Sequence, residues 1–299
     1  MITNFETNKA FIAKGLSSIP YSYTAYSLVT SLYNQNLEWG QLPFSESPLH
    51  IWARDYMPVQ VNKEKFVKFN YNPDYLRNYP QYKPDTSNML SGLDIKVIYS
   101  DLVVDGGNII SCGDKVIMTD KIFLENVHIN RTSLIDTLSH LLEAEIVLIP
   151  WDRHEEYGHA DGMVRYMGEG NVLINNYCDF DKSLQKKLTS ILGRHFCVNE
   201  LHYGTFTARS WAYLNFLHVG RHLFIPMLGE RLDSIAYGQI AESFPECECH
   251  PIINCESVVN EGGALNCCTW NMMSNSISPE TDNITLPLGL PNNSDSSGS

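Results

Sequence analysis

Long apolar segments and basic residues are both scarce in this sequence. No run of apolar residues approaches the roughly 20 residues that a membrane-spanning helix requires. Residues 1–16 include Asn4, Glu6 and Lys9, where a secretory signal would have an unbroken apolar core, so we expect a cytoplasmic protein. The chain has 21 Lys and Arg against 34 Asp and Glu, a net charge of -13. Such a balance argues against nucleic acid as a partner, because phosphates require a basic surface, and is compatible with a cationic substrate.

Paired Cys-x-x-Cys spacings, which are typical of zinc sites, are absent as well. The eight cysteines are scattered, and in a reducing compartment most would be free buried thiols. The densest group comprises Cys247, Cys249, His250 and Cys255. Because Cys247 and Cys249 are two positions apart, we favour a strand with both thiols on one face over a zinc site.

A pattern of paired apolar runs recurs along the chain. Residues 59–62 and 66–69 alternate around a polar turn, which predicts a β-hairpin. Similar hairpin patterns follow residues 105, 159 and 213, and a fifth begins at residues 265–272 with its second strand expected from residues 8–14. Helical patterns lie between the units, at residues 23–33, 132–143, 182–192 and 232–243. Residues 71–92, rich in Tyr, Pro and Asn, are expected to form a long surface loop.

A polar residue precedes each of these hairpins. They are Asp55, Asp105, His159 with Asp161, Asn215 and Cys267. Their successive separations, by subtraction of residue numbers, are 50, 54, 56 and 52. The preference of Asp and Asn for turns would explain two or three of these positions, but not the spacing of all five. A period of about fifty residues is typical of repeats, and equivalent positions of repeats around an axis converge on one cleft.

Two local predictions assume an extended backbone. Residues two apart on a strand face the same side, so His159 and Asp161 would project together, although such a pair alone is more often structural than catalytic. By the same reasoning Cys267 and Cys268 would face opposite ways. The glycines at 262 and 263, which adopt φ of either sign, are suited to a loop that aims a thiol into a cleft.

The chemistry of the expected cleft points to a cation. One thiol, one imidazole, three carboxylates and an amide would meet there, and the carboxylates would repel a thiolate unless the substrate carried positive charge. A planar guanidinium fits, because its N–H fork pairs bidentately with carboxylates. Trp52, close to Asp55, could add a cation–π contact. We therefore expect a small cationic guanidino compound as the substrate.

Five stretches of the sequence carry a family resemblance. They are residues 52–58 (WARDYMP), 105–108 (DGGN), 158–162 (GHADG), 213–216 (YLNF) and 262–267 (GGALNC). In this order and spacing they resemble the motifs of the agmatine deiminase and Porphyromonas-type peptidylarginine deiminase family, part of the pentein or guanidino-group-modifying superfamily. The resemblance covers roughly residues 8–275. It implies an α/β fold, a propeller of five ββαβ units about a pseudo-fivefold axis.

The resemblance also implies catalytic roles. Cys267, which matches the Cys-x-Thr pattern of the family better than Cys268 does, would attack the guanidinium carbon and form a thiouronium adduct. His159 would protonate the departing ammonia and then activate water. Asp105, where many relatives have glutamate, would orient the histidine. The reaction implied needs no metal and no other cofactor.

Substrate binding follows in the same way. The resemblance implies that Asp55 and Asp161 clamp the guanidinium nitrogens and that Asn215 lies near the site. Two positions depart from the agmatine deiminase pattern: Asn266 replaces a histidine before the cysteine, and Met57 replaces a glycine before the proline. These departures leave the hydrolytic residues intact but weaken the transfer of substrate identity.

The favoured function is hydrolysis of agmatine to a ureido product and ammonia, a reaction of putrescine biosynthesis. Open alternatives are deimination of peptidyl or free arginine, amidinotransfer or dimethylarginine hydrolysis, and a non-catalytic pentein that binds a partner. A papain-like protease is disfavoured, because it would not need the additional carboxylates. We expect residues 1–277 to form one catalytic domain and residues 278–299 to be a disordered tail, since the tail has little to bury.

Overall fold

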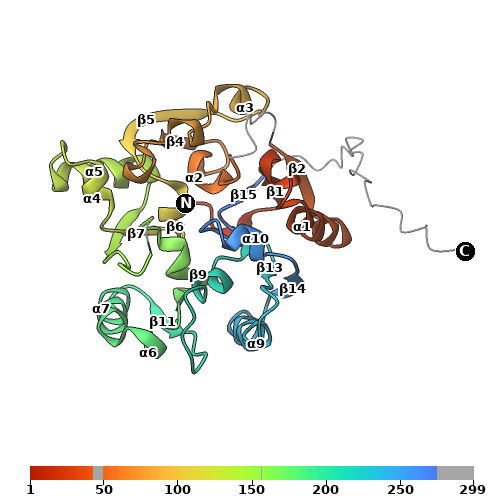
Figure 1. Cartoon of the computed structure of the whole chain (residues 1–299). Helices are drawn as coiled ribbons and strands as arrows, with labels where there is room; N and C mark the ends of the chain where they lie inside the picture. Colours follow the sequence, from red (N-terminus) through yellow and green to blue (C-terminus); the bar gives the residue numbers. More distant parts are fainter. Residues whose placement is uncertain (43–49, 156, 275–299) are drawn as a thin grey trace, which may run out of the picture.

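A computed structural model describes residues 1–42, 50–155 and 157–274. Five three-stranded sheets follow one another around a central axis (Figure 1), which confirms the pentein-type α/β architecture. The expected tail at residues 278–299 lies outside the described residues. Within the described ranges, no helix is both long enough and apolar enough to cross a membrane.

Each sheet consists of an antiparallel hairpin and a third strand that runs parallel to the second. Unit 1 comprises β3 (Val59–Gln60), β4 (Phe66–Asn70) and β5 (Val97–Val103). Unit 2 comprises β6 (Ile110–Ser111), β7 (Lys115–Thr119) and β8 (Glu145–Ile149). Unit 3 comprises β9 (Val164–Gly168), β10 (Asn171–Ile174) and β11 (Cys197–Glu200), and unit 4 comprises β12 (Leu217–Val219), β13 (His222–Pro226) and β14 (Glu248–Ile252).

Unit 5 joins the two ends of the described chain. Its hairpin pairs β15 (Thr269–Met272) with β1 (Lys9–Ile12), and β2 (Glu38–Gln41) completes it. The sequence prediction that the N-terminal strand supplies the second strand of the fifth hairpin is therefore confirmed. This pairing closes the ring of sheets.

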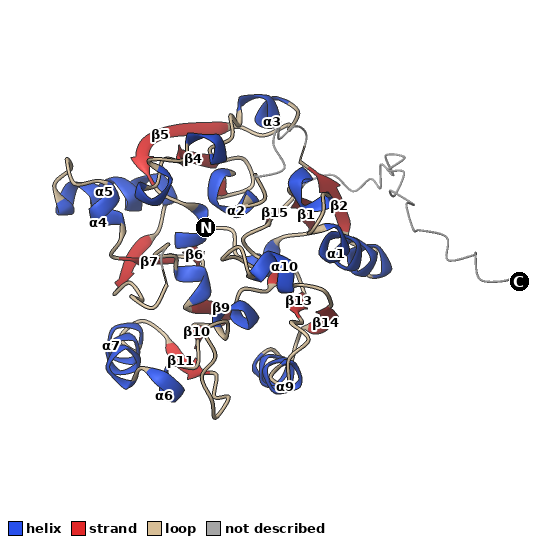
Figure 2. Cartoon of the chain, in the orientation of Figure 1, coloured by secondary structure: helices blue, strands red, loops and turns tan. Residues whose placement is uncertain are grey.

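A helix links the second and third strands of every unit. In unit order these are α3 (Ser87–Ser91), α5 (Arg131–Leu142), α7 (Lys182–Leu192), α9 (Asp233–Ser243) and α1 (Ser22–Asn34). Figure 2 shows the helices at the periphery and the strands between them and the axis. Five shorter helices lie in the connections: α2 (Ala53–Tyr56), α4 (Ile122–Glu125), α6 (Tyr177–Phe180), α8 (Trp211–Leu214) and α10 (Glu256–Val259).

Local sequence explains the best-defined helices. The side chain of Asn130 accepts hydrogen bonds from the backbone N–H groups of residues 132 and 133 at the start of α5, and Asp181 caps α7 in the same way. Each helix then buries leucines four residues apart, which places them on one face towards the sheets. In α5 and α7 these are Leu134, Leu138 and Leu142, and Leu184, Leu188 and Leu192.

The segment at residues 71–92 differs from the predicted surface loop. It contains two 3-10 turns (Asp74–Leu76 and Pro80–Tyr82) and α3. One of its tyrosines, Tyr75, turns inward and donates a hydrogen bond from its hydroxyl to Asp105 at 2.9 Å. A loop that contributes to the centre of the molecule must bury part of its apolar surface, and tyrosine does this while keeping a polar tip.

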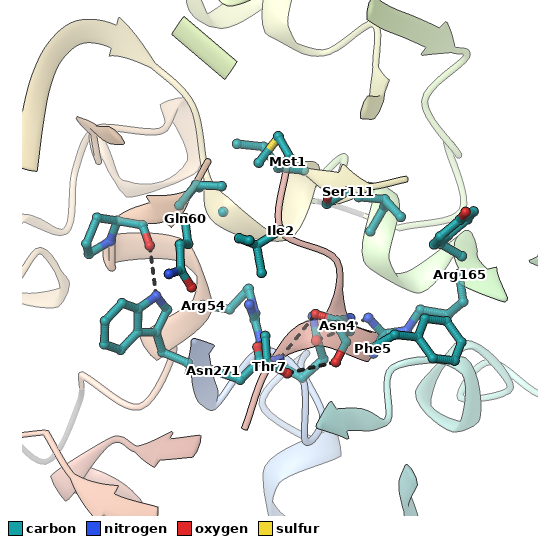
Figure 3. A pocket seen from close by; sticks show the side chains of 18 residues that line it. Met1, Ile2, Asn4, Phe5, Thr7, Arg54, Gln60, Ser111, Arg165 and Asn271 are labelled. Carbon is teal, nitrogen blue, oxygen red and sulfur yellow. Dashed lines mark hydrogen bonds between the residues drawn. The ribbon is translucent and has the colours of Figure 1, made fainter. Parts of the chain in front are cut away.

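The first residues of the chain lie at the centre of the ring (Figures 1 and 3). They contact the hairpins of several units: the Ile2 N–H donates to the Val61 carbonyl at 3.1 Å, and the Gly220 N–H donates to the Asn4 carbonyl at 2.9 Å. Phe5 packs edge-on against the ring of Tyr166. This segment therefore ties units 1, 3 and 4 together at the axis.

Candidate active site

The polar residue that precedes each hairpin lies in a short helical turn or at its edge. Asp55 is within α2, and Asn215 follows α8 directly. Asp105 precedes a 3-10 turn (Gly106–Asn108), and Cys267 lies in the turn before β15. Because the five turns occupy equivalent places in the five units, their side chains meet at the axis.

The predicted strand around His159 is wrong. His159 has extended backbone angles but directly precedes a 3-10 turn (Ala160–Gly162) that contains Asp161, and β9 begins only at Val164. Both side chains nevertheless line the same cavity. Likewise Cys267 and Cys268 lie before β15 rather than in it, although they do point into different surroundings.

His159 lies between two carboxylates. Its Nε2 is 3.0 Å from Asp105 Oδ2, and its Nδ1 is 3.7 Å from Asp55 Oδ1. Burial alone would lower the pKa of His159, but the two aspartates outweigh burial and raise it to about 10. The imidazole is therefore protonated at neutral pH. Asp105 reaches His159 despite being a methylene shorter than glutamate.

The glycines after Asp105 make this approach possible. A Cβ on Gly107 would lie 2.7 Å from His159 Nδ1 and 2.8 Å from Asp55 Oδ1, so a larger residue would separate the pair. The Gly107 N–H also donates to Asp55 Oδ1 at 3.0 Å. Burial raises the pKa of Asp55, and the neighbouring Asp105 and Asp161 raise it further, against the lowering effect of His159. Burial and the two neighbouring aspartates therefore make a charged Asp55 carboxylate less favourable, and the contact with His159 offsets part of this cost.

Cys267 lies on the other side of this cluster. Its Sγ is 3.4 Å from Asp161 Oδ2 and 3.3 Å from Asn215 Oδ1, and its backbone N–H donates to the same Asn215 oxygen. Burial, Asp161 and Asp55 hold the pKa of this thiol well above its usual value. In the free protein Cys267 is therefore a neutral thiol that donates a weak hydrogen bond. Cys268 is fully buried in the core beside Leu265.

Two arginines behind the site were not singled out by the sequence reasoning: Arg165 is buried and Arg54 is half-buried. Arg165 donates from Nη1 to the Asn266 Oδ1 at 3.1 Å, and Asn266 donates from Nδ2 to Asp161 Oδ2 at 2.7 Å. Arg54 donates from Nε to the Asn266 carbonyl at 3.3 Å. The backbone and side chain of Asn266 thus connect both guanidinium groups to the carboxylate beside Cys267.

These arginines line a small second cavity of about 70 Å³ next to the N-terminal segment (Figure 3). Burial lowers the pKa of Arg165 to about 10, which still leaves it charged at neutral pH. Arg54 and Arg165 therefore supply positive charge to a site rich in carboxylates. A signal was present in the sequence: Arg165 interrupts the apolar run at residues 163–167, where a charged residue is costly without a partner.

A cavity of about 290 Å³ opens beside the thiol. Of the predicted site residues, those that line it are His159, Asp161, Asn215 and Cys267. Asp55 and Asp105 contact His159 instead, from outside this lining. The Trp52 ring packs against Gly263, where a Cβ would lie 2.2 Å from it, and it does not line the cavity. The volume suits a small molecule rather than a polymer.

Aromatic and acidic side chains form part of the remaining lining of this cavity. Phe180 and Phe206 lie together, with ring centroids 4.5 Å apart. Asp152 and Glu155 also line the cavity. Glu155 accepts hydrogen bonds from the Trp151 indole and from the backbone of Tyr157, which fixes its carboxylate. The cavity therefore combines an apolar wall with negative charge, and such a lining favours a molecule with an aliphatic chain and positive charge.

Similar proteins share this architecture. The sequence is 23% identical over 280 residues to a "Putative agmatine deiminase" of Vibrio parahaemolyticus, covering 77% of this chain and 76% of that protein. The agmatine deiminase structure of Enterococcus faecalis has a TM-score of 0.70 at 16% identity, covering 92% of this chain and 96% of that one. The DDAH structure of Pseudomonas aeruginosa has a TM-score of 0.60 at 13% identity, covering 90% and 100%.

A family model extends this likeness over most of the chain. The model of the Porphyromonas-type peptidyl-arginine deiminase family matches residues 24–272. This range includes every polar residue that the five units bring to the axis. The chain belongs to the Porphyromonas-type peptidyl-arginine deiminase family.

Proposed function

We propose that this protein is a cysteine-dependent deiminase that hydrolyses a guanidino C–N bond of a small arginine-derived cation, with agmatine as the favoured substrate. The observation that carries the proposal is a thiol, Cys267 Sγ, 3.4 Å from one carboxylate in a cluster that also holds a protonated imidazole between two further carboxylates. The names of the relatives, agmatine deiminases among them, agree with this chemistry.

The substrate brings positive charge directly beside the Cys267 sulfur. A guanidinium beside Cys267 pairs with Asp161, and we propose that it also reaches Asp55, which the free protein holds outside the cavity lining. The cation stabilises both the carboxylates and the thiolate, so Cys267 releases its proton to solvent only when substrate is bound. The positive charges of Arg54 and Arg165 act in the same direction.

The first half-reaction replaces a C–N bond with a C–S bond. The Cys267 thiolate attacks the guanidinium carbon and forms a tetrahedral adduct. His159, held protonated by Asp105 and Asp55, gives its proton to the departing nitrogen, which leaves as ammonia. A thiouronium adduct on Cys267 remains, and His159 is now neutral.

The second half-reaction releases the product. Neutral His159 takes a proton from a water molecule that attacks the thiouronium carbon. The C–S bond then breaks and the Cys267 thiolate is regenerated. The hydroxyl on the carbon gives its remaining proton to solvent, which leaves a ureido group. Asp105 keeps the imidazole in place through both steps, because its Oδ2 bonds to Nε2 and is itself held by Tyr75.

The test offers purified protein agmatine, free arginine, methylated arginines and an arginyl peptide, with ammonia and ureido product measured for each. We expect turnover of agmatine, loss of turnover in Cys267→Ala, and retention of most activity in the matched variant Cys268→Ala. Turnover of another guanidine would reassign the substrate but keep the reaction. No turnover of any of them by protein with a reduced Cys267 would refute a deiminase.

A further inference from the structure

Three side chains capable of binding a metal ion meet on the sheet of unit 4. His222 is the first residue of β13, and Glu248 and His250 lie on the neighbouring strand β14. The strand register places His222 opposite Glu248. Glu248 and His250, two residues apart, project from the same face of β14. The proposed deiminase reaction uses none of the three.

Their ligand atoms are already close together. His222 Nδ1 is 3.1 Å from His250 Nε2 and 3.9 Å from Glu248 Oε2. Zn²⁺ binds imidazole nitrogen at about 2.0–2.1 Å, so two such nitrogens in tetrahedral coordination lie about 3.3 Å apart. The two histidines therefore approach the separation that one ion requires. The Glu248 side chain is 71% exposed, so its carboxylate can rotate towards them.

Packing holds the two imidazoles in this arrangement. The rings of His222 and His250 are stacked with centroids 5.3 Å apart, and the buried ring of Phe224 stacks on His250 at 5.1 Å. The packing thus holds one nitrogen of each ring beside the other.

We propose that His222, His250 and Glu248 form a binding site for Zn²⁺ or a similar divalent ion, with water completing the coordination. Two imidazoles and one carboxylate are a ligand set that suits such borderline metals. The bound ion joins β13 to β14, which is the outer strand of its sheet. It therefore acts as a cross-link in unit 4, and the net charge of -13 favours its association.

The nearby cysteines are not part of this site. Cys249 adjoins both Glu248 and His250 in the strand and so projects from the opposite face, where it packs against the core together with Cys247. The zinc site that the sequence analysis disfavoured, built on these cysteines, is therefore not assembled. The histidine of that group, His250, instead pairs with a residue about thirty positions earlier in the chain.

A second cluster, Cys178, Asp179 and His202, also brings potential ligands together. Asp179 there already accepts hydrogen bonds from the backbone N–H groups of Tyr203 and Gly204 and from the Asn176 amide. These bonds give the carboxylate a structural role in the loop that follows β11. Among the described residues, the side chains of the cluster on unit 4 contact one another, through the hydrogen bond between His222 Nδ1 and His250 Nε2, and not backbone donors, so we favour it.

The experiment measures binding of Zn²⁺ alone to the metal-stripped protein by titration calorimetry, followed by the absorption spectrum with Co²⁺. We expect one ion bound per chain and a Co²⁺ spectrum without the charge-transfer band of a thiolate ligand. Loss of a residue that only hydrogen-bonds to a metal ligand typically weakens metal binding roughly 10- to 100-fold. His222→Ala and His250→Ala each remove a ligand itself, so they should weaken Zn²⁺ binding by more than this. The matched control His128→Ala removes an exposed histidine elsewhere and should leave binding unchanged.

Thermal unfolding provides an independent readout. Zn²⁺ should raise the melting temperature of the wild type and of His128→Ala but not of His250→Ala, because only a protein that binds the ion is stabilised by it. Binding that persists in the double variant of His222 and His250 would overturn the proposal. So would a thiolate band in the Co²⁺ spectrum, which would place the ion on a cysteine, or the absence of binding in the wild type.

Discussion

Cys267 should react with a cationic alkylating agent far faster than with a neutral one of the same shape. Burial and the carboxylates of Asp161 and Asp55 keep this thiol protonated in the free protein. Chloroacetamidine and chloroacetamide share one leaving group, but only the amidine carries positive charge. The amidine should therefore act as its own activator when it enters the site.

The geometry sets the size of this effect. Asp161 Oδ2 lies 3.4 Å from the sulfur, so a cation paired with that carboxylate is in contact with the thiol. A unit charge about 4 Å from the sulfur, at an effective dielectric constant of about 20, favours the thiolate by about 4 kcal/mol, or roughly a thousandfold. The second-order rate constant for the amidine should therefore exceed that for the amide roughly a thousandfold. Each rate constant is first divided by that of the same reagent with a small free thiol, which corrects for intrinsic reactivity.

The assay follows loss of activity with time and locates the adduct by mass spectrometry. The adduct should appear on Cys267 and be absent from the Cys267→Ala variant. Asp161→Asn, which removes one carboxylate while keeping the shape of the side chain, should reduce the preference for the amidine. Equal corrected rates for the two reagents, or ionisation of Cys267 near neutral pH in the free protein, would refute the reasoning.

Three further variants test the surroundings of the site. Asn266→Leu breaks the link between Arg165 and Asp161. The loss of a hydrogen bond to a charged group costs about 1.5–3 kcal/mol, so kcat in steady-state assays should fall roughly 10- to 100-fold. An unchanged kcat would contradict this role. Tyr75→Phe should lower kcat by about tenfold, because Asp105 loses a donor. The pKa of His159 is raised from 6.5 to about 10 in the folded protein. Protonation of His159 therefore stabilises the folded protein fully below pH 6.5, and this stability is lost as pH rises through about 10. The free energy of unfolding of the wild type, measured with urea, should decline over this pH range, and the decline should be smaller in His159→Gln. The same dependence on pH in both proteins would refute the raised pKa.

Local sequence determined much of the fold. The leucine spacing and caps of α5 and α7 specify those helices without reference to the rest of the chain. The hairpin patterns and the separations of 50 to 56 residues between Asp55, Asp105, His159, Asn215 and Cys267 follow from the repeat. A repeat arranged about an axis needs no further information to bring equivalent positions together.

Other features arise from contacts between units and could not be read from periodicity. The strand predicted around His159 is a 3-10 turn, because the backbone must turn there to bring both His159 and Asp161 towards the axis. The same convergence brings Asn266 between Arg165 and Asp161, residues about a hundred positions away. Sequence spacing carries no information on such pairings.

Protonation states depend on the tertiary structure most of all. The sequence by itself determined which ionisable groups the five units bring to the axis. Only the fold decided that His159 is charged and Cys267 is not, because burial and the distances to the surrounding aspartates set each pKa. The same holds for His222 and His250, which become a pair of potential metal ligands only when β13 lies beside β14. Composition and motifs supply the groups, and three-dimensional proximity gives them their chemistry.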